Sequence, residues 1–100
     1  MPKGYVIVTE AIHDRAGMEA YGAASFPSIR EFGAKVLVAT EELDVLEGEW
    51  HGNRTVIVEF ESVEQARAWY DSASYQAALP MRLAASDCNA VVVPGFTMGR

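Results

Sequence analysis

The sequence predicts an α+β fold in which helices cover one face of a single antiparallel sheet. Segments rich in β-branched and aromatic residues alternate with segments of helical periodicity, in the order strand, helix, strand, hairpin strand, strand, helix, short helix, strand. This βαββαβ order is that of the ferredoxin-like arrangement. The 100 residues are half hydrophobic, which suffices for one core and leaves no room for two, so we expect one domain over residues 1–100.

The first strand and the first helix are predicted by a change of periodicity. Residues 5–12 are mostly β-branched and aromatic, and Asp14 then offers an N-cap. Pro27 removes one backbone donor, which predicts a kink or a break near Ala23. Gly33 is placed to end this helix in the left-handed conformation. The residues that recur at helical spacing between these ends are Met18, Tyr21, Ser25, Ile29 and Phe32.

The middle of the chain predicts two strands with a hairpin between them. The strands are expected over residues 35–39 and 54–60. Residues 43–47 alternate weakly, and residues 51–53 have turn chemistry. We therefore expect an added hairpin beside the main sheet, with Trp50 near its end.

The last part of the chain predicts two helices and a final strand. Ser62 begins a capping box that starts the first of these helices. Ser72 or Ser74 can cap a second, shorter helix over residues 75–85. The final strand is expected over residues 89–93.

The predicted strands are apolar on both faces, which is informative about assembly. In the first strand Val6 and Val8 lie on one face, and Tyr5 and Ile7 lie on the other. Helices cover only one face of such a sheet, and a soluble monomer rarely exposes a large apolar surface. We therefore expect a homodimer that packs sheet to sheet. The alternative is that the predicted hairpin shields this face.

Composition excludes several classes of partner. The 14 Asp and Glu residues exceed the 8 Lys and Arg residues, giving a net charge of −6, which argues against nucleic acid and anionic membranes as partners. No apolar run approaches the length of a membrane span or a secretory signal, so a soluble, cytoplasmic protein is expected. Cys88 is the single cysteine, and no His or Cys pair has metal-ligand spacing, so we expect neither a metal nor a cofactor.

Glu59 and His13 are the weak candidates for a catalytic role. Glu59 stands between Val58 and Phe60 on a strand, where a carboxylate is costly unless it is paired, and Arg82 could supply the partner. A structural ion pair, or a Glu at the solvent-filled mouth of a dimer, explains the same pattern. His13 is flanked by carboxylates that could raise its pKa, although a solvated loop histidine is the plainer interpretation.

A cluster of aromatic residues suggests where a small ligand would bind. Trp69, Tyr70 and Tyr75 could line a pocket for a planar, apolar molecule, with phenolic hydroxyls that orient it and with Arg82 nearby. Plain core packing is the alternative. Haem binding by His13 or His51 is a third hypothesis, for which nothing else in the sequence argues.

A distinctive set of residues occurs in the second half of the chain: Val45-Leu46-Glu47-Gly48-Glu49-Trp50, Arg54, Glu59-Phe60, Ser62, Ala66-Arg67-Ala68-Trp69-Tyr70, Ser72, Tyr75-Gln76 and Arg82. This set resembles the domain-of-unknown-function family DUF1330, and the resemblance covers essentially the whole chain. It is specific between Leu46 and Arg82 and extends weakly over the first half, through Gly4, Tyr5, Tyr21 and Gly33.

This resemblance implies a ferredoxin-like protein of the dimeric α+β barrel superfamily. That superfamily includes cofactor-free monooxygenases, lactone isomerases and haem-degrading enzymes, but the family itself has no agreed reaction, so the resemblance assigns no catalytic residue. The chain departs from the family pattern at Gly33-Ala34-Lys35, where a double glycine and Arg are usual, and at Glu61, where Pro is common.

Two functional hypotheses follow. In the first, the protein is a homodimer that binds or converts a small apolar or aromatic metabolite without a tightly bound cofactor, through proton transfer by Glu59 or His13. In the second, it is a non-catalytic dimeric binding or assembly module, in which Trp69 and Tyr75 are only packed. The sequence leaves open whether the protein is an enzyme.

Overall fold

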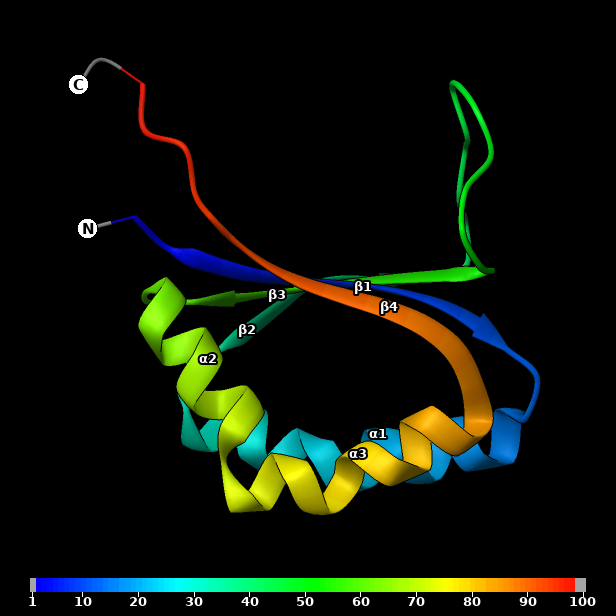
Figure 1. The fold of residues 1–100 in the computed structure, drawn as a ribbon, viewed down its shortest axis with the longest axis horizontal. Coiled ribbons are helices and arrows are strands. Elements are labelled where there is room, and N and C mark those ends of the chain that lie inside the picture. Colours follow the sequence, from blue (N-terminus) through cyan, green and yellow to red (C-terminus); the bar gives the residue numbers. More distant parts are fainter. Residues whose placement is uncertain (1, 99–100) are drawn as a thin grey trace.

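A computed structural model describes residues 2–98 and contains a four-stranded antiparallel sheet with three helices on one of its faces (Figure 1). The elements follow one another as β1 (Gly4–Ile12), α1 (Arg15–Glu31), β2 (Lys35–Thr40), β3 (Arg54–Phe60), α2 (Val63–Asp71), α3 (Ala73–Ala85) and β4 (Ser86–Pro94). The predicted α+β fold of ferredoxin-like type is confirmed.

The sheet has the strand order β2-β3-β1-β4, so the first and third strands lie at its centre. In the register of β1 with β3, Val6 lies opposite Val58 and Glu10 lies opposite Arg54. These residues face the helices. The residues between them, such as Ile7 and Ile57, face the other way.

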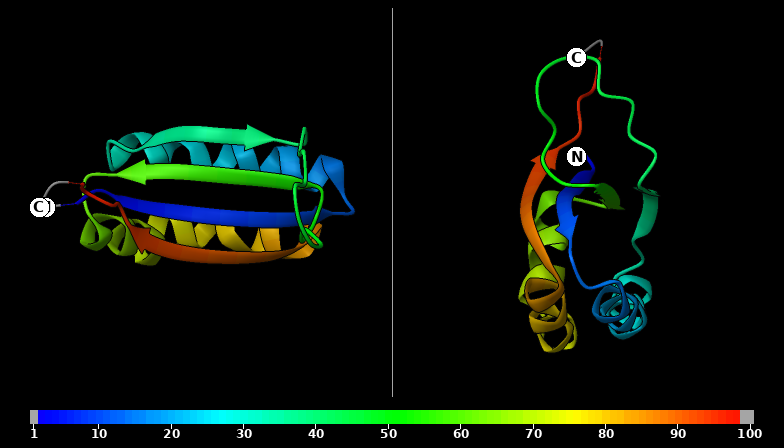
Figure 2. Two further views of the ribbon diagram at one scale, coloured as in Figure 1. Left: turned by 90° about the horizontal axis from the view of Figure 1, so that it is seen from above. Right: turned by 90° about the vertical axis from the view of Figure 1, so that its right-hand side faces the viewer.

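The helices form a layer below the sheet in which α1 and α3 lie side by side (Figures 1 and 2). Of the three helices, α2 lies closest to the central strands, whereas α1 packs chiefly along α3. The core cluster sits between α2, α3 and the sheet and includes Phe60, Trp69 and Tyr75. This arrangement leaves a space between α1 and the sheet.

The predicted caps are present, but the predicted helix break is not. The side chain of Asp14 accepts a hydrogen bond from the Gly17 amide, and Ser62 and Ser72 cap α2 and α3 in the same way. Gly33 has φ of 64°, the left-handed conformation expected of it. Helix α1 runs without interruption past Pro27, because the loss of one backbone donor is offset by the packing of the helix on α3.

The expected hairpin strand is also absent. Residues 41–53 form a long loop that rises from the sheet on the side away from the helices (Figures 1 and 2). The base of the loop is held by hydrogen bonds of the Asn53 amide to the Glu10 carbonyl oxygen (2.7 Å) and of the Trp50 indole N–H to the Thr55 hydroxyl (3.0 Å). Leu46 near its tip is 88% exposed. The weak alternation of residues 43–47 therefore belongs to an exposed loop, because no neighbouring strand pairs with these residues.

The sheet face opposite the helices, called the open face here, is largely apolar, as predicted. Its side chains include Tyr5, Ile7, Val38, Ile57, Val91 and Val93. Val91 is 52% exposed. None of the helices within residues 2–98 is both long and apolar enough to cross a membrane.

Candidate functional site

The space between α1 and the helix-facing side of the sheet is a cavity of about 200 Å³, called the inner cavity here. Its walls are mainly apolar and come from β1, β2, β3, α1 and α2. Polar groups in the lining come from Glu10, Tyr21, Ser25 and Arg54. The apolar wall includes Val6, Val8, Ile29, Val58 and Trp69.

Glu10 is the most unusual residue of this cavity. Its side chain is 1% exposed, although it is a carboxylate on a central strand. Its charged partner is Arg54, the opposing residue on β3, whose Nη1 lies 3.4 Å from Glu10 Oε1. Burial raises the pKa of the Glu10 carboxyl, and the nearby Arg54 and Arg82 charges oppose that rise without cancelling it.

A second buried charge, Arg82, lies close to Glu10. Arg82 is 3% exposed and has no carboxylate within 4 Å among the described residues. Its Nε donates to the Tyr75 hydroxyl at 3.3 Å, and its Nη1 donates to Cys88 Sγ at 2.8 Å. The Tyr75 hydroxyl is in turn 2.8 Å from the hydroxyl of Tyr21, and Tyr21 is a lining residue of the inner cavity. Arg82 is therefore linked to the cavity through two tyrosines.

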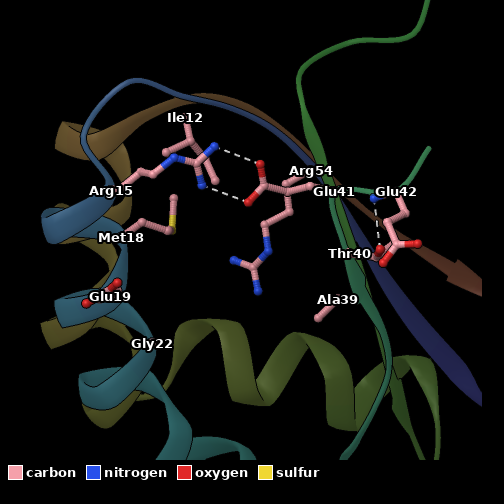
Figure 3. Close-up of a pocket in the computed structure, with 10 residues that line it drawn as sticks. All are labelled: Ile12, Arg15, Met18, Glu19, Gly22, Ala39, Thr40, Glu41, Glu42 and Arg54. Atoms are coloured by element: carbon pink, nitrogen blue, oxygen red, sulfur yellow. Dashed lines mark hydrogen bonds and ion pairs between the residues drawn. The ribbon is translucent and has the colours of Figure 1, made fainter.

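An outer, more polar pocket of about 560 Å³ adjoins the inner cavity (Figure 3). The two share the lining residues Gly22, Ala39 and Arg54. Across the outer pocket the Arg15 guanidinium of α1 donates two hydrogen bonds, of 2.7 and 2.8 Å, to the Glu41 carboxylate at the end of β2. Figure 3 shows the Arg54 guanidinium beneath this ion pair, among the lining residues of the pocket.

The structure brings three of the four predicted pocket residues together. The Trp69 and Tyr75 rings stack at a centroid distance of 4.0 Å, and Arg82 donates to Tyr75. Trp69 lines the inner cavity, while Tyr75 and Arg82 stand behind the lining. Tyr70 packs on Tyr75 at 5.6 Å but lines a different surface depression, toward β4.

The two predicted catalytic candidates lie outside the inner cavity. Glu59 is on the open face, where its carboxylate accepts a hydrogen bond from the Tyr5 hydroxyl at 3.0 Å. The expected pairing of Glu59 with Arg82 is therefore not formed, since Arg82 is buried on the helix side of the sheet. His13 is exposed in the turn before α1. His51 lies at the base of the 41–53 loop, 2.8 Å from the Thr9 hydroxyl.

Sequence reasoning missed Glu10 as a site residue, although a signal was available. Glu10 continues the alternation of Val6 and Val8, so it belongs to the same face of β1 as these two core residues. A charged residue at a core position of a strand is a stronger indication than one between apolar neighbours, because adjacent strand residues face opposite sides. Glu59 is in that second situation.

Comparisons with known proteins agree with this fold. The model of the family described as "Domain of unknown function (DUF1330)" matches residues 3–96. A search of curated protein sequences found no match.

Solved structures of similar fold include proteins without an assigned function. A protein of unknown function from Rhodopseudomonas palustris has a TM-score of 0.80 at 19% identity, over 96% of this chain and 84% of the other. A dimeric protein of unknown function with a ferredoxin-like fold, from Bacteroides fragilis, has a TM-score of 0.63 at 14% identity, over 93% and 96%.

One similar structure belongs to an enzyme. SnoaB, a cofactor-independent oxygenase from Streptomyces nogalater, has a TM-score of 0.66 at 10% identity, over 100% of both chains. At such identities the likeness concerns the fold.

Proposed function

The chain belongs to the DUF1330 family, and we propose that it binds a small apolar or aromatic molecule in the inner cavity and transfers a proton to or from it through Glu10. The observation that carries the proposal is the buried Glu10 carboxylate in an otherwise apolar cavity. Perturbed carboxylates in concave apolar sites are typical of functional residues.

Glu10 is poorly accounted for by stability alone. Burying a carboxylate costs several kcal/mol unless close hydrogen bonds compensate for the lost water. Among residues 2–98, the one charged contact to Glu10 within 4 Å comes from Arg54 and is long at 3.4 Å. A role toward a ligand gives a reason for a carboxylate at this position, because the carboxylate lines an otherwise apolar cavity.

The chemistry needs only side chains of this chain. A carboxylate with a raised pKa is a stronger base, so Glu10 can accept a proton from an acidic C–H or O–H group of the ligand. The anion that remains on the ligand lies near the positive charges of Arg54 and Arg82. The fold shared with a cofactor-independent oxygenase is compatible with such chemistry but does not identify the reaction.

The test begins with a screen of small aromatic compounds. Binding is detected through the amide chemical shifts of Gly22 and Val58 and through the indole resonance of Trp69. A compound that shifts these signals is then assayed for conversion with Glu10→Gln, and with Glu64→Gln, an exposed residue of α2, as the control. We expect Glu10→Gln to retain binding and to reduce turnover by about a hundredfold or more.

The same assay separates Glu10 from the two candidates that the sequence suggested. Full turnover by Glu10→Gln together with loss in Glu59→Gln or His13→Asn would transfer the role to one of those residues. If bound compounds remain unconverted by the wild-type protein, the non-catalytic binding module is the correct description. A screen in which no compound shifts the cavity signals contradicts a ligand site altogether.

We also propose that the protein is a homodimer in which a second copy covers the open face. The open face is apolar, and the 41–53 loop and the C-terminal tail rise on the same side of the sheet (Figure 1). These segments carry Leu46 at 88% and Phe96 at 85% exposure. Apolar side chains that project beside an apolar face favour a partner of matching shape, and a second copy supplies one. The dimeric state of a similar structure supports this assembly.

A further inference from the structure

We propose that the ligand of the inner cavity carries a carboxylate, which is recognised by the guanidinium of Arg54 and the hydroxyl of Tyr21. This inference rests on the proposed ligand site and specifies the chemical class of its occupant. It follows from three features of the cavity: its charge balance, the direction of its hydrogen bonds, and its size.

The charged groups around the cavity leave an excess of positive charge. Glu10 contributes one negative charge, whereas Arg54 and Arg82 contribute two positive charges that both act on it. The outer pocket is lined by the Arg15–Glu41 ion pair and also by Glu19 and Glu42, so the excess of positive charge is confined to the inner cavity. An anionic ligand would restore the balance inside, where the apolar walls make an uncompensated charge costly.

Arg54 has donors to spare. A guanidinium presents five N–H donors, and within residues 2–98 the side chain of Arg54 makes one hydrogen bond, to Glu10 at 3.4 Å. Its position at the junction of the inner cavity and the outer pocket places the remaining donors where a ligand entering from the outer pocket would meet them. Arginine is well suited to this because its planar fork matches the two oxygens of a carboxylate.

Hydrogen-bond direction makes Tyr21 a donor to the ligand. Arg82 cannot accept a hydrogen bond, so the Tyr75 hydroxyl accepts from it. Tyr75 is 1% exposed, and among the described residues the Tyr21 oxygen is the one acceptor within reach of its own hydrogen, at 2.8 Å. Tyr21 must therefore accept from Tyr75, which leaves its hydrogen for another acceptor.

A ligand in the cavity is one acceptor for that hydrogen, and the neighbouring Ser25 hydroxyl oxygen is another. The Ser25 hydroxyl, which also lines the cavity, donates to the Gly22 carbonyl oxygen at 3.4 Å. Burial raises the pKa of Tyr21, with Tyr75 adding to the rise, so the hydroxyl keeps its proton and remains a donor. The Tyr21 hydroxyl can therefore donate to a carboxylate in the cavity in exchange for its contact with Ser25.

Size and overall charge restrict the ligand further. The volume of about 200 Å³ is below the roughly 300–1,000 Å³ of sites for drug-sized molecules, so the acid is small. The net charge of the chain is −6, which repels anions at long range. A measured preference for an anion would therefore have to come from the side chains of the cavity, against the net charge of the chain.

The experiment compares four probes of similar shape: toluene, benzamide, benzoate and benzylamine. Binding is followed through the amide shifts of Gly22 and Val58, which report on the cavity. In the wild-type protein we expect benzoate to bind at least tenfold more tightly than benzamide, and benzylamine to bind most weakly.

Two variants test the residues. Arg54→Gln should bring the affinities for benzoate and benzamide to within about twofold of each other, and Tyr21→Phe should weaken benzoate about tenfold while leaving toluene unchanged. The matched controls are Arg67→Gln, an exposed guanidinium on α2, and Tyr5→Phe, whose hydroxyl is hydrogen-bonded on the open face. Both controls should behave like the wild-type protein. Should Tyr21→Phe fail to fold, Arg54→Gln still decides the question.

The outcomes separate this inference from the proposed function. Binding of toluene with no preference for benzoate over benzylamine overturns the carboxylate proposal and leaves the ligand site standing. A preference for benzoate that remains in both Arg54→Gln and Tyr21→Phe likewise overturns the carboxylate proposal and leaves the ligand site standing. If none of the four probes shifts the cavity signals, the ligand site and the carboxylate proposal are both wrong.

Discussion

At the scale of single residues, the molecule concentrates its unusual chemistry on the buried side of β1. Glu10 sits in a row with Val6 and Val8, beside Arg54 on one neighbouring strand and opposite Cys88 on the other. Arg82 reaches the same region from α3. A carboxylate and two guanidiniums thus lie in one region of a small protein, and both positive charges act on the buried Glu10.

The raised pKa of Glu10 makes stability depend on pH in a predictable direction. As pH rises above the ordinary Glu value of 4.5, the unfolded chain loses its proton first, so the folded state loses stability until pH exceeds the pKa of buried Glu10. The Glu10→Gln variant has no titratable carboxyl group at this position, so its stability lacks this dependence on pH. We expect the wild-type protein to lose unfolding free energy relative to Glu10→Gln as the pH rises from 4.5 toward the raised pKa of Glu10.

The measurement is urea denaturation of both proteins across that range, with Glu64→Gln as an exposed control. Parallel stability curves for the wild-type protein and Glu10→Gln would show that Glu10 titrates alike in the folded and unfolded chains. The expected trend is opposite to that of a carboxylate stabilised by a close ion pair, such as Glu41, whose pKa is lowered by Arg15.

At the scale of elements, the boundaries follow local signals and the errors follow from tertiary context. Asp14, Ser62 and Gly33 mark helix ends through hydrogen bonds and backbone geometry that depend on neighbouring residues alone. Pro27 was predicted to interrupt α1, but a helix packed along a second helix tolerates the loss. Residues 43–47 alternate without becoming a strand, since a strand needs a partner that periodicity cannot provide.

The candidate site was only partly predictable for the same reason. The aromatic cluster around Trp69 and Tyr75 was visible because its members are near one another along the chain. The approach of Glu10, Arg54 and Arg82 depends on the register of three strands and on the placement of α3. Such contacts depend on the whole fold, so no local sequence pattern predicts them.

Gly52 provides a prediction about how the loop is joined to the site. Gly48 and Gly52 both have positive φ, 75° and 83°, so an Ala at either position costs about 1–2 kcal/mol in backbone strain. A Cβ at Gly52 would also collide with the Glu10 backbone, whereas one at Gly48 meets nothing within 4 Å. We expect the Gly52→Ala variant to be less stable than the Gly48→Ala variant by about 1–3 kcal/mol.

Denaturant unfolding of the two variants checks this difference. Amide shifts of β1 residues should change in Gly52→Ala and remain as in the wild-type protein in Gly48→Ala. Equal stability of the two variants would show that the base of the loop moves freely away from Glu10.

At the scale of the whole molecule, the sheet separates two apolar regions, the inner cavity and the open face. On the helix side, α1 leaves the inner cavity between itself and the sheet. On the other side lies the open face with its raised loop and tail (Figure 2). We have proposed a ligand for the first region and a second copy of the chain for the second.

The proposed dimer predicts that a charge on the open face disrupts assembly. Val91 on β4 is 52% exposed and lies on the open face, and Leu83 on α3 is 58% exposed on the helix side. We expect Val91→Glu to shift the protein from dimer to monomer, because the carboxylate would be desolvated in the interface. Leu83→Glu should leave the dimer intact.

Size-exclusion chromatography with light scattering measures both variants. A wild-type protein that elutes as a monomer, or a Val91→Glu variant as dimeric as Leu83→Glu, would contradict the assembly through the open face. Loss of the dimer in both variants would point to a general loss of folding, which circular dichroism detects.

The two tryptophans stand on opposite sides of the sheet. Trp69 is 3% exposed and lines the inner cavity, whereas Trp50 is 53% exposed at the base of the raised loop. Their intrinsic fluorescence therefore distinguishes the two events: quenching of the buried indole follows occupancy of the cavity, and a blue shift of the exposed indole follows its burial by another chain. The protein carries an optical reporter for each of its two faces, and no label has to be attached.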